Sequence, residues 1–276
     1  MNKLSLGFSP CPNDTYIFDA LVNHKIEHSF DFQLFLEDVE TLNKWSMKRV
    51  LDISKISIHA FFHVLENYTL LSSGAALGRG CGPLVIQKGK GPVRSGKIAL
   101  PGKFTTASLL FDMAIQGDFQ YVYMPFDKII PAVLQDEVDA GIIIHESRFT
   151  YQEVGLHCWL DLGKWWEEET GSLIPLGAIM IAKDMDKKIQ SDLERLIRLS
   201  LNFADNAPTM PKFVLENAQE MDLNVLKNHI HLYVNQYSRE LGDEGKNAIQ
   251  QLYLKSSEMG LIPKTSSGFE DQLFCS

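Results

Sequence analysis

The stretch "GIIIHESRFTYQ", residues 141–152, is the part of the sequence that decides how the fold is interpreted. It begins with three consecutive isoleucines, a β-branched run typical of a strand that is buried on both faces. The run stops at His145, and three further polar residues follow it: Glu146, Ser147 and Arg148. Polar side chains directly after a buried strand are the pattern expected at the ligand-binding edge of an open α/β sheet.

The sequence on either side alternates strand-like and helical runs up to about residue 180, which predicts βαβ units and a mostly parallel sheet. Asp38 is expected to cap the helix "VETLNKWSMKR", and either Asn13 or Asp14 is expected to cap the helix "TYIFDALVN". From about residue 186 onward the pattern is helical. Strands are expected in "KLSLGF", "FDFQLFLE", "LDISKIS", "PLVIQ", "GKIAL", "YVYMPF" and "DAGIII".

Two segments are expected to carry the chain between two lobes. One is the glycine-rich stretch "GRGCGPLVIQKGKGP", residues 78–92, and the other is the apolar run "IPLGAIMIAK". The sequence therefore predicts an α/β protein with two lobes, a central cleft and a helical C-terminal segment. The larger lobe is expected to comprise residues 1–88 and 178–276, and the smaller lobe residues 89–177.

His145 is the sharpest candidate for chemistry, because an uncharged imidazole at the ligand edge of a sheet can remove or deliver a proton near neutral pH. A histidine that only packs and bonds a neighbouring carbonyl is the alternative, and the position after Ile144 favours a function. Glu146, Ser147 and Arg148 are explained equally well as the start of the next helix. The turns expected at the cleft are Ser9–Asp14, Lys55–Ser57, Phe104–Ala107 and His145–Arg148.

Two turns carry hydroxyl groups that are suited to an anion. In "GKFTTAS", Thr105 and Thr106 precede a helix whose first N–H groups are free, although a threonine N-cap is an equally good interpretation. In "SKIS", Ser57 stands beside Lys55 and follows the same logic. Neither turn has the ending of a P-loop, so a nucleoside triphosphate is disfavoured.

A metal site is not expected from residue spacing. The four cysteines form no CxxC pair. His229 and His231 should point to different faces of a helix, and His59 and His63 share a face but have no acidic or cysteine partner nearby in the sequence. A packed helix face is the better interpretation of His59 and His63.

The composition limits the class of partner. The formal net charge of −9 and the isoelectric point near 5.4 count against nucleic acid, but they leave room for a small anionic ligand held by local positive groups. No apolar run approaches the roughly 20 residues that span a bilayer. The N-terminal residues also lack the pattern of a secretory signal, so we expect a cytoplasmic protein without membrane insertion.

Several stretches together resemble the 1,4-dihydroxy-6-naphthoate synthases of the futalosine route to menaquinone. The resemblance runs from residue 4 to about residue 180 and continues more loosely through "HIHLYVNQYS". The matching stretches are "LGFSPCPNDTYIF", "LEDVETLN", "SKIS", "GRGCGPLV", "PGKFTTA", "GIIIHESRFTY" and "PLGAI".

The resemblance implies a periplasmic-binding-protein-like (type II) fold and a lyase reaction. Cyclic dehypoxanthinyl futalosine would be cleaved to 1,4-dihydroxy-6-naphthoate and dihydroxyacetone, with neither a redox cofactor nor a metal ion. The family's proposed base corresponds to His145. The substrate-contacting turns correspond to Lys55, Ile56 and Ser57, and to Thr106 and Ala107, with Ser9, Asn13, Asp14, Thr105, Glu146, Ser147 and Arg148 as further candidate pocket residues.

Two alternatives share this fold. A solute-binding protein for transport is disfavoured by the same lack of a signal or lipid anchor. The chorismate dehydratase of the same pathway is closer, but "CPNDTYIF" and "IIHESRFTY" favour the synthase. A likeness of fold alone would not separate these functions.

Overall fold

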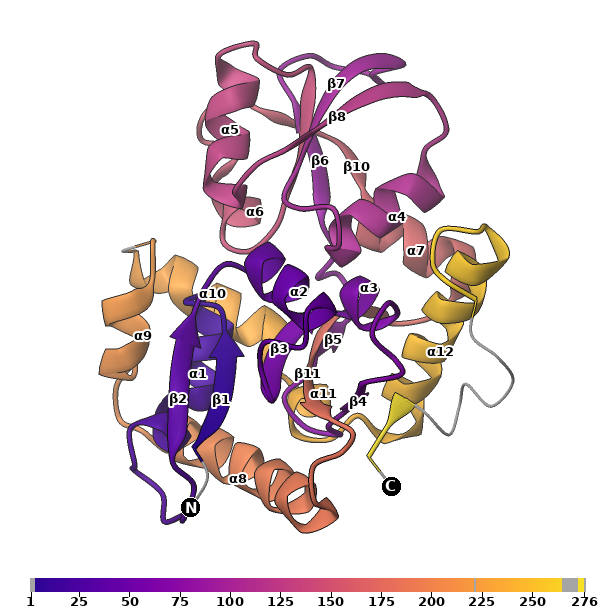
Figure 1. Cartoon of the computed structure of the whole chain (residues 1–276). Helices are drawn as coiled ribbons and strands as arrows, with labels where there is room; N and C mark the ends of the chain where they lie inside the picture. Colours follow the sequence, from indigo (N-terminus) through magenta and orange to yellow (C-terminus); the bar gives the residue numbers. More distant parts are fainter. Residues whose placement is uncertain (1–2, 221, 265–272, 276) are drawn as a thin grey trace.

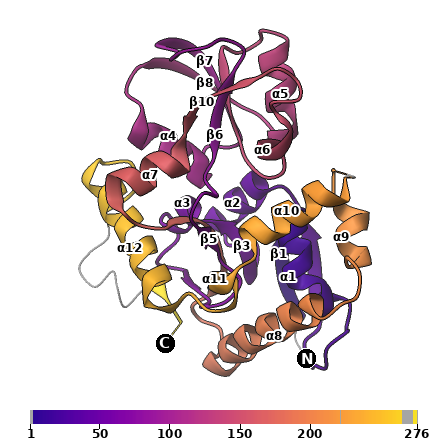
Figure 2. The ribbon, with the colours of Figure 1, turned by 180° about the vertical axis from the view of Figure 1, so that it is seen from behind.

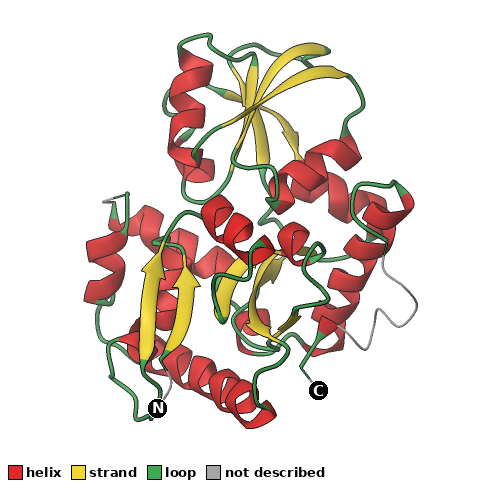
Figure 3. Cartoon of the chain, viewed as in Figure 1, coloured by secondary structure: helices red, strands yellow, loops and turns green. Residues whose placement is uncertain are grey.

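A computed structural model describes residues 3–220, 222–264 and 273–275, and it contains two β-sheets that are each flanked by helices (Figures 1 and 3). In the first sheet the strand order is β2 (Phe32–Leu36), β1 (Leu4–Phe8), β3 (Ile53–Ser57), β11 (Ile174–Ala182) and β4 (Tyr68–Leu70), with β5 (Ala76–Gly78) also paired to β11. In the second sheet the order is β10 (His157–Asp161), β6 (Leu84–Gln87), β9 (Ala140–Ile143), β7 (Ser95–Leu100) and β8 (Asp118–Tyr123).

The helices cover both faces of the first sheet and flank the second. Figure 1 shows α2 and α3 in front of the first sheet, and Figure 2 shows α1 and α10 on the opposite side. Within the described residues, no helix is both long and apolar enough to cross a membrane. The helices are α1 (Pro12–Val22), α2 (Val39–Met47), α3 (Ile58–Phe61), α4 (Thr106–Ala114), α5 (Phe126–Leu134), α6 (Ser147–Thr150), α7 (Leu162–Thr170), α8 (Lys187–Asp205), α9 (Lys212–Asn217), α10 (Leu223–Tyr233), α11 (Gln236–Arg239) and α12 (Gly242–Glu258).

The starts of the first two helices show one correct and one wrong prediction. The Asp38 side chain caps α2 by accepting hydrogen bonds from two backbone N–H groups, as predicted. The predicted cap of α1 is wrong, because the helix begins at Pro12 with Cys11 at the N-cap. Proline is preorganised for the first helical position, so Asn13 and Asp14 fall inside the first turn of the helix.

The prediction of a mostly parallel sheet is also wrong, because both sheets are mixed. β1 runs parallel to β2 and β3, but β11 is antiparallel to β3 and β4. In the second sheet β6 is antiparallel to β9. The cause is the crossing between the sheets. β11 returns to the first sheet from the second one and enters it in the opposite direction.

The lobe boundaries at 88/89 and 177/178 stay a prediction. Among the described strands, β6 pairs with those of the second sheet, and β11 already belongs to the first sheet at Ile174. Sheet membership therefore changes several residues before each predicted boundary. The segment with the highest glycine content, before β6, is where the chain leaves the first sheet.

The largest apolar cluster includes buried residues from both sheets. Leu70 and Met180 of the first sheet and Ile98 and Ile142 of the second are members of it, each fully or almost fully buried. Because such a cluster is close-packed, it fixes the strand ends of the two sheets relative to one another. The site described next is formed by those strand ends.

Candidate active site

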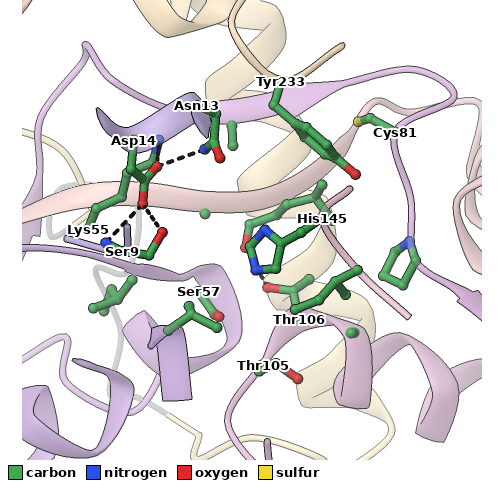
Figure 4. Close-up of a pocket in the computed structure, with 18 residues that line it drawn as sticks. Ser9, Asn13, Asp14, Lys55, Ser57, Cys81, Thr105, Thr106, His145 and Tyr233 are labelled. Carbon is green, nitrogen blue, oxygen red and sulfur yellow. Dashed lines mark hydrogen bonds and ion pairs between the residues drawn. The ribbon is translucent and has the colours of Figure 1, made fainter. Parts of the chain in front are cut away.

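One cavity lies where the strand ends of the two sheets meet, and it holds about 680 Å³ of atom-free space, part of which is open to solvent (Figure 4). The first sheet contributes the turn after β1, the end of β3 and a stretch of β11, and the second contributes the turns after β7 and β9. The predicted residues that line it are Ser9, Asn13, Asp14, Lys55, Ile56, Ser57, Thr105, Thr106, Ala107 and His145. Glu146, Ser147 and Arg148 are not part of its lining.

His145 enters this cavity on an unusual backbone. β9 ends at Ile143, one residue earlier than the isoleucine run suggested, and His145 has a φ of 59°. A left-handed conformation costs a non-glycine residue of the order of 1–3 kcal/mol, so the surrounding structure must hold it there. The His145 ring lies between Phe126, at 4.8 Å, and His229, at 6.1 Å between ring centroids.

The electrostatic surroundings keep the His145 ring neutral near pH 7. Burial lowers the pKa of His145, and the nearby carboxylates of Glu146 and Asp14 oppose that effect only in part. Within the described part of the chain, we find no hydrogen bond to this ring. A neutral imidazole with an unengaged nitrogen beside a cavity is suited to accept a proton from a ligand.

Lys55 supplies a buried positive charge to the cavity lining. It lies on β3, every residue of which is buried, and its Nζ is 2.6 Å from Oδ1 of Asp14. The Asp14 carboxylate also accepts hydrogen bonds from Ser9 Oγ and from Asn13 Nδ2, each at 2.7 Å. Asp14 therefore balances the ammonium charge, and the four side chains form one network at the cavity wall.

The hydroxyl groups of the turn after β7 are already engaged within the protein. Thr105 is an ordinary N-cap, because its hydroxyl accepts from Ser108 N and donates to the Gly102 carbonyl. The Thr106 hydroxyl donates to the carbonyl of Leu176 at 2.7 Å. Of this turn, only the backbone N–H groups at the N-terminus of α4 are therefore available to bind an anion. This end of a helix carries a partial positive charge.

Ser57 and its neighbours are fixed in a similar way. The Ser57 N–H donates to Asn43 Oδ1 and its Oγ accepts from Asn43 Nδ2, so α2 holds the end of β3. Next along the chain, His59 of α3 and His63, which follows the end of that helix, pack against each other with their Nε2 atoms 3.3 Å apart. Both rings also contact Phe104. The two rings are packed as expected from the sequence, but they do not share a helix face, because α3 ends before His63.

The residues after His145 separate into two groups. Glu146 is buried, and its Oε2 lies 3.6 Å from Nδ1 of His229. Arg148 instead donates to the carbonyl of Gly82 at 2.9 Å, so it holds the segment where the chain leaves the first sheet. Ser147 begins α6. Ser147 and Arg148 therefore lie outside the cavity lining, although Arg148 interacts with Tyr233 of that lining, whereas Glu146 belongs to the surroundings of His145.

Sequence reasoning missed two residues of α10. Tyr233 lines the cavity, and His229 lies behind it with no exposed surface. Burial, together with the charges of His145 and Lys55, holds the pKa of His229 well below its usual value. The available signal was the spacing of His229 and Tyr233, which at i and i+4 share one helix face.

The fold and the cavity together define a class of protein. Two mixed α/β sheets with a polar cavity between their strand ends form the framework of a two-lobed small-molecule binding protein. The chain is similar to the periplasmic aliphatic sulphonate binding protein of Escherichia coli, with a TM-score of 0.65, 11% identity, and coverage of 99% of this chain and 92% of that one. At that level of identity the likeness concerns the fold alone.

The chain belongs to the menaquinone biosynthesis family, whose model matches residues 4–258. It is 44% identical over 263 residues to the 1,4-dihydroxy-6-naphthoate synthase of Thermus thermophilus, covering 95% of this chain and 96% of that protein. It also resembles a solved protein of Archaeoglobus fulgidus, with a TM-score of 0.90, 35% identity, and coverage of 94% of this chain and 98% of the other.

Proposed function

We propose that this chain is a 1,4-dihydroxy-6-naphthoate synthase, a carbon–carbon lyase of menaquinone biosynthesis. The observation that carries the proposal is the 44% identity to such a synthase over nearly the full length of both chains. The substrate would be cyclic dehypoxanthinyl futalosine, and the products 1,4-dihydroxy-6-naphthoate and dihydroxyacetone. As an enzyme of a biosynthetic route, it is proposed to act in the cytoplasm on a small anionic substrate.

His145 is proposed as the general base. Removal of a substrate proton allows the sugar remnant to leave by C–C cleavage, and the product gains its second aromatic ring, which supplies driving force. The neutral, unengaged imidazole of His145 at the cavity supports this assignment. A positioned base contributes about 10²–10⁴ in rate.

The substrate carboxylate is proposed to bind between the N-terminus of α4 and the end of β3. Thr106 and Ala107 lie in the first turn of α4, where backbone N–H groups face a ligand rather than the helix. Lys55, Ile56 and Ser57 line the same cavity. Because the side-chain hydroxyl groups are engaged elsewhere, we assign the anion contacts to backbone N–H groups and not to the Thr105 and Thr106 hydroxyls.

The test is incubation of the purified protein with cyclic dehypoxanthinyl futalosine, followed by chromatography. We expect the naphthoate and dihydroxyacetone in equal amounts, and no consumption of chorismate in a parallel reaction. His145→Asn serves as the matched control for contaminating activity. Dehydration of chorismate in place of naphthoate formation would identify the chain as the related dehydratase, and binding of either compound without turnover would favour a binding protein.

A further inference from the structure

Two buried acceptor atoms face each other beside the cavity, between the β9–α6 turn and helix α10. Glu146 Oε2 and His229 Nδ1 are 3.6 Å apart, and within the described residues neither has a hydrogen-bond partner. The His229 side chain has no exposed surface, and that of Glu146 is only 10% exposed. Leaving such groups without a partner costs about 1–3 kcal/mol each, so this arrangement needs an explanation.

The tautomer of His229 follows from its neighbours. Asn13 Nδ2 donates to Oδ1 of Asp14 at 2.7 Å, which fixes the orientation of the Asn13 amide. Asn13 Oδ1 therefore faces His229 Nε2, at 2.9 Å, and can only accept. The Nε2 atom of His229 carries the hydrogen, and Nδ1 presents a lone pair to the Glu146 carboxylate. Two acceptors in this geometry need a cation or a proton between them.

His145 supplies a third ligand atom at the same place. One ligand atom from each of His145, Glu146 and His229 lies within 4.8 Å of the other two. Two imidazoles and a carboxylate are a donor set that Zn²⁺ takes in open sites, with ligand bonds of about 2.0–2.2 Å. At a tetrahedral angle those bonds place two ligand atoms about 3.4 Å apart, close to the separation of Glu146 Oε2 and His229 Nδ1.

The surroundings also match a metal site. A metal-bound histidine commonly donates its other ring N–H to a fixed acceptor, and Asn13 is that acceptor for His229. The ammonium group of Lys55 is nearby, but the carboxylate of Asp14 balances its charge.

We propose that His145, Glu146 and His229 form a binding site for one divalent metal ion of the zinc type. The site goes beyond the proposed function, because a metal ion on His145 occupies the lone pair that the base would use. Metal binding and proton abstraction by His145 therefore exclude each other, and the ion acts as an inhibitor.

The test is metal binding by the full chain in the absence of any substrate. After dialysis against a chelator, we expect one Zn²⁺ per chain by equilibrium dialysis, and visible absorption typical of tetrahedral Co²⁺ when cobalt is added instead. Glu146→Gln and His229→Gln should weaken Zn²⁺ binding by at least about ten-fold. The matched control is His231→Gln, because His231 lies on the same helix but is exposed, and this variant should bind as the unchanged chain does.

A further variant tests the hydrogen bond between Asn13 and His229. Asn13→Ala leaves all three ligands in place but removes the acceptor of the His229 N–H, and we expect a loss of affinity of about 10–100-fold. Far-UV circular dichroism of each variant shows whether weaker metal binding results from the loss of a ligand or from the loss of the folded structure. The proposal is overturned if the folded protein binds less than one ion per chain, or if Glu146→Gln binds as tightly as His231→Gln.

Discussion

Replacing Lys55 by methionine should destabilise the fold strongly, although the substitution keeps the length of the side chain. Lys55 Nζ and Asp14 Oδ1 are 2.6 Å apart, and the two side chains are only 5% and 7% exposed. With an effective dielectric constant of about 20, the attraction at this distance is about 6 kcal/mol, from which the desolvation of both ions subtracts. Removal of one partner of a buried pair typically costs about 3–5 kcal/mol, because the other charge stays buried.

The remaining contacts of Asp14 place the expected loss near the lower end of that range. Ser9 and Asn13 still donate to the carboxylate in the variant, so we expect about 3 kcal/mol in the free energy of unfolding. Guanidinium unfolding followed by the fluorescence of the four tryptophans, among them the buried Trp166, measures it. The matched control is Lys128→Met, whose exposed ion pair with Asp127 should contribute at most about 1 kcal/mol.

A double variant tests whether each of the two charges is buried at the expense of the other. Asp14→Asn combined with Lys55→Met removes both charges, and it should recover about half of the stability that Lys55→Met loses, because no buried ion is then left without a partner. If Lys55→Met costs less than the Lys128→Met control, or if the double variant is less stable than Lys55→Met, the pair does not stabilise the site as argued.

Three further predictions concern the site itself. His145→Asn cannot accept a proton, and we expect normal folding, retained substrate binding and a loss of at least about 10² in kcat; near-normal turnover would move the base to another residue. Burial lowers the pKa of His145 below 6.5. We therefore expect kcat/KM to be constant near pH 7 and to fall only as the pH drops through that lowered pKa. An inflection above pH 7 in the pH–rate profile would contradict the assignment of His145 as the base. Thr106→Val removes the donor to the Leu176 carbonyl, so thermal or chemical unfolding should show a loss of about 1–3 kcal/mol, and unchanged stability would mean that this bond contributes nothing.

The sequence by itself determined most of the elements, though not β4, β5 or β10, and the positions of most of the cavity residues. A β-branched run that ends in polar residues places His145 at a strand end, and the turn residues before α4 place Thr105 at an N-cap. These signals are local, because strand period, helix spacing and capping depend on residues within a few positions of each other. The same locality explains why Asp38 was predicted correctly as a helix cap.

Only the tertiary structure decided which side chains meet and which groups stay free. The antiparallel entry of β11 could not be predicted, because strand direction depends on how the chain returns from the second sheet. The Thr106 hydroxyl is engaged by Leu176, a residue 70 positions away. His229 could not be recognised from its neighbour His231, since its partner Asn13 lies 216 positions away along the chain. Contacts at such separations are set by the packing of whole elements, and no local pattern encodes them.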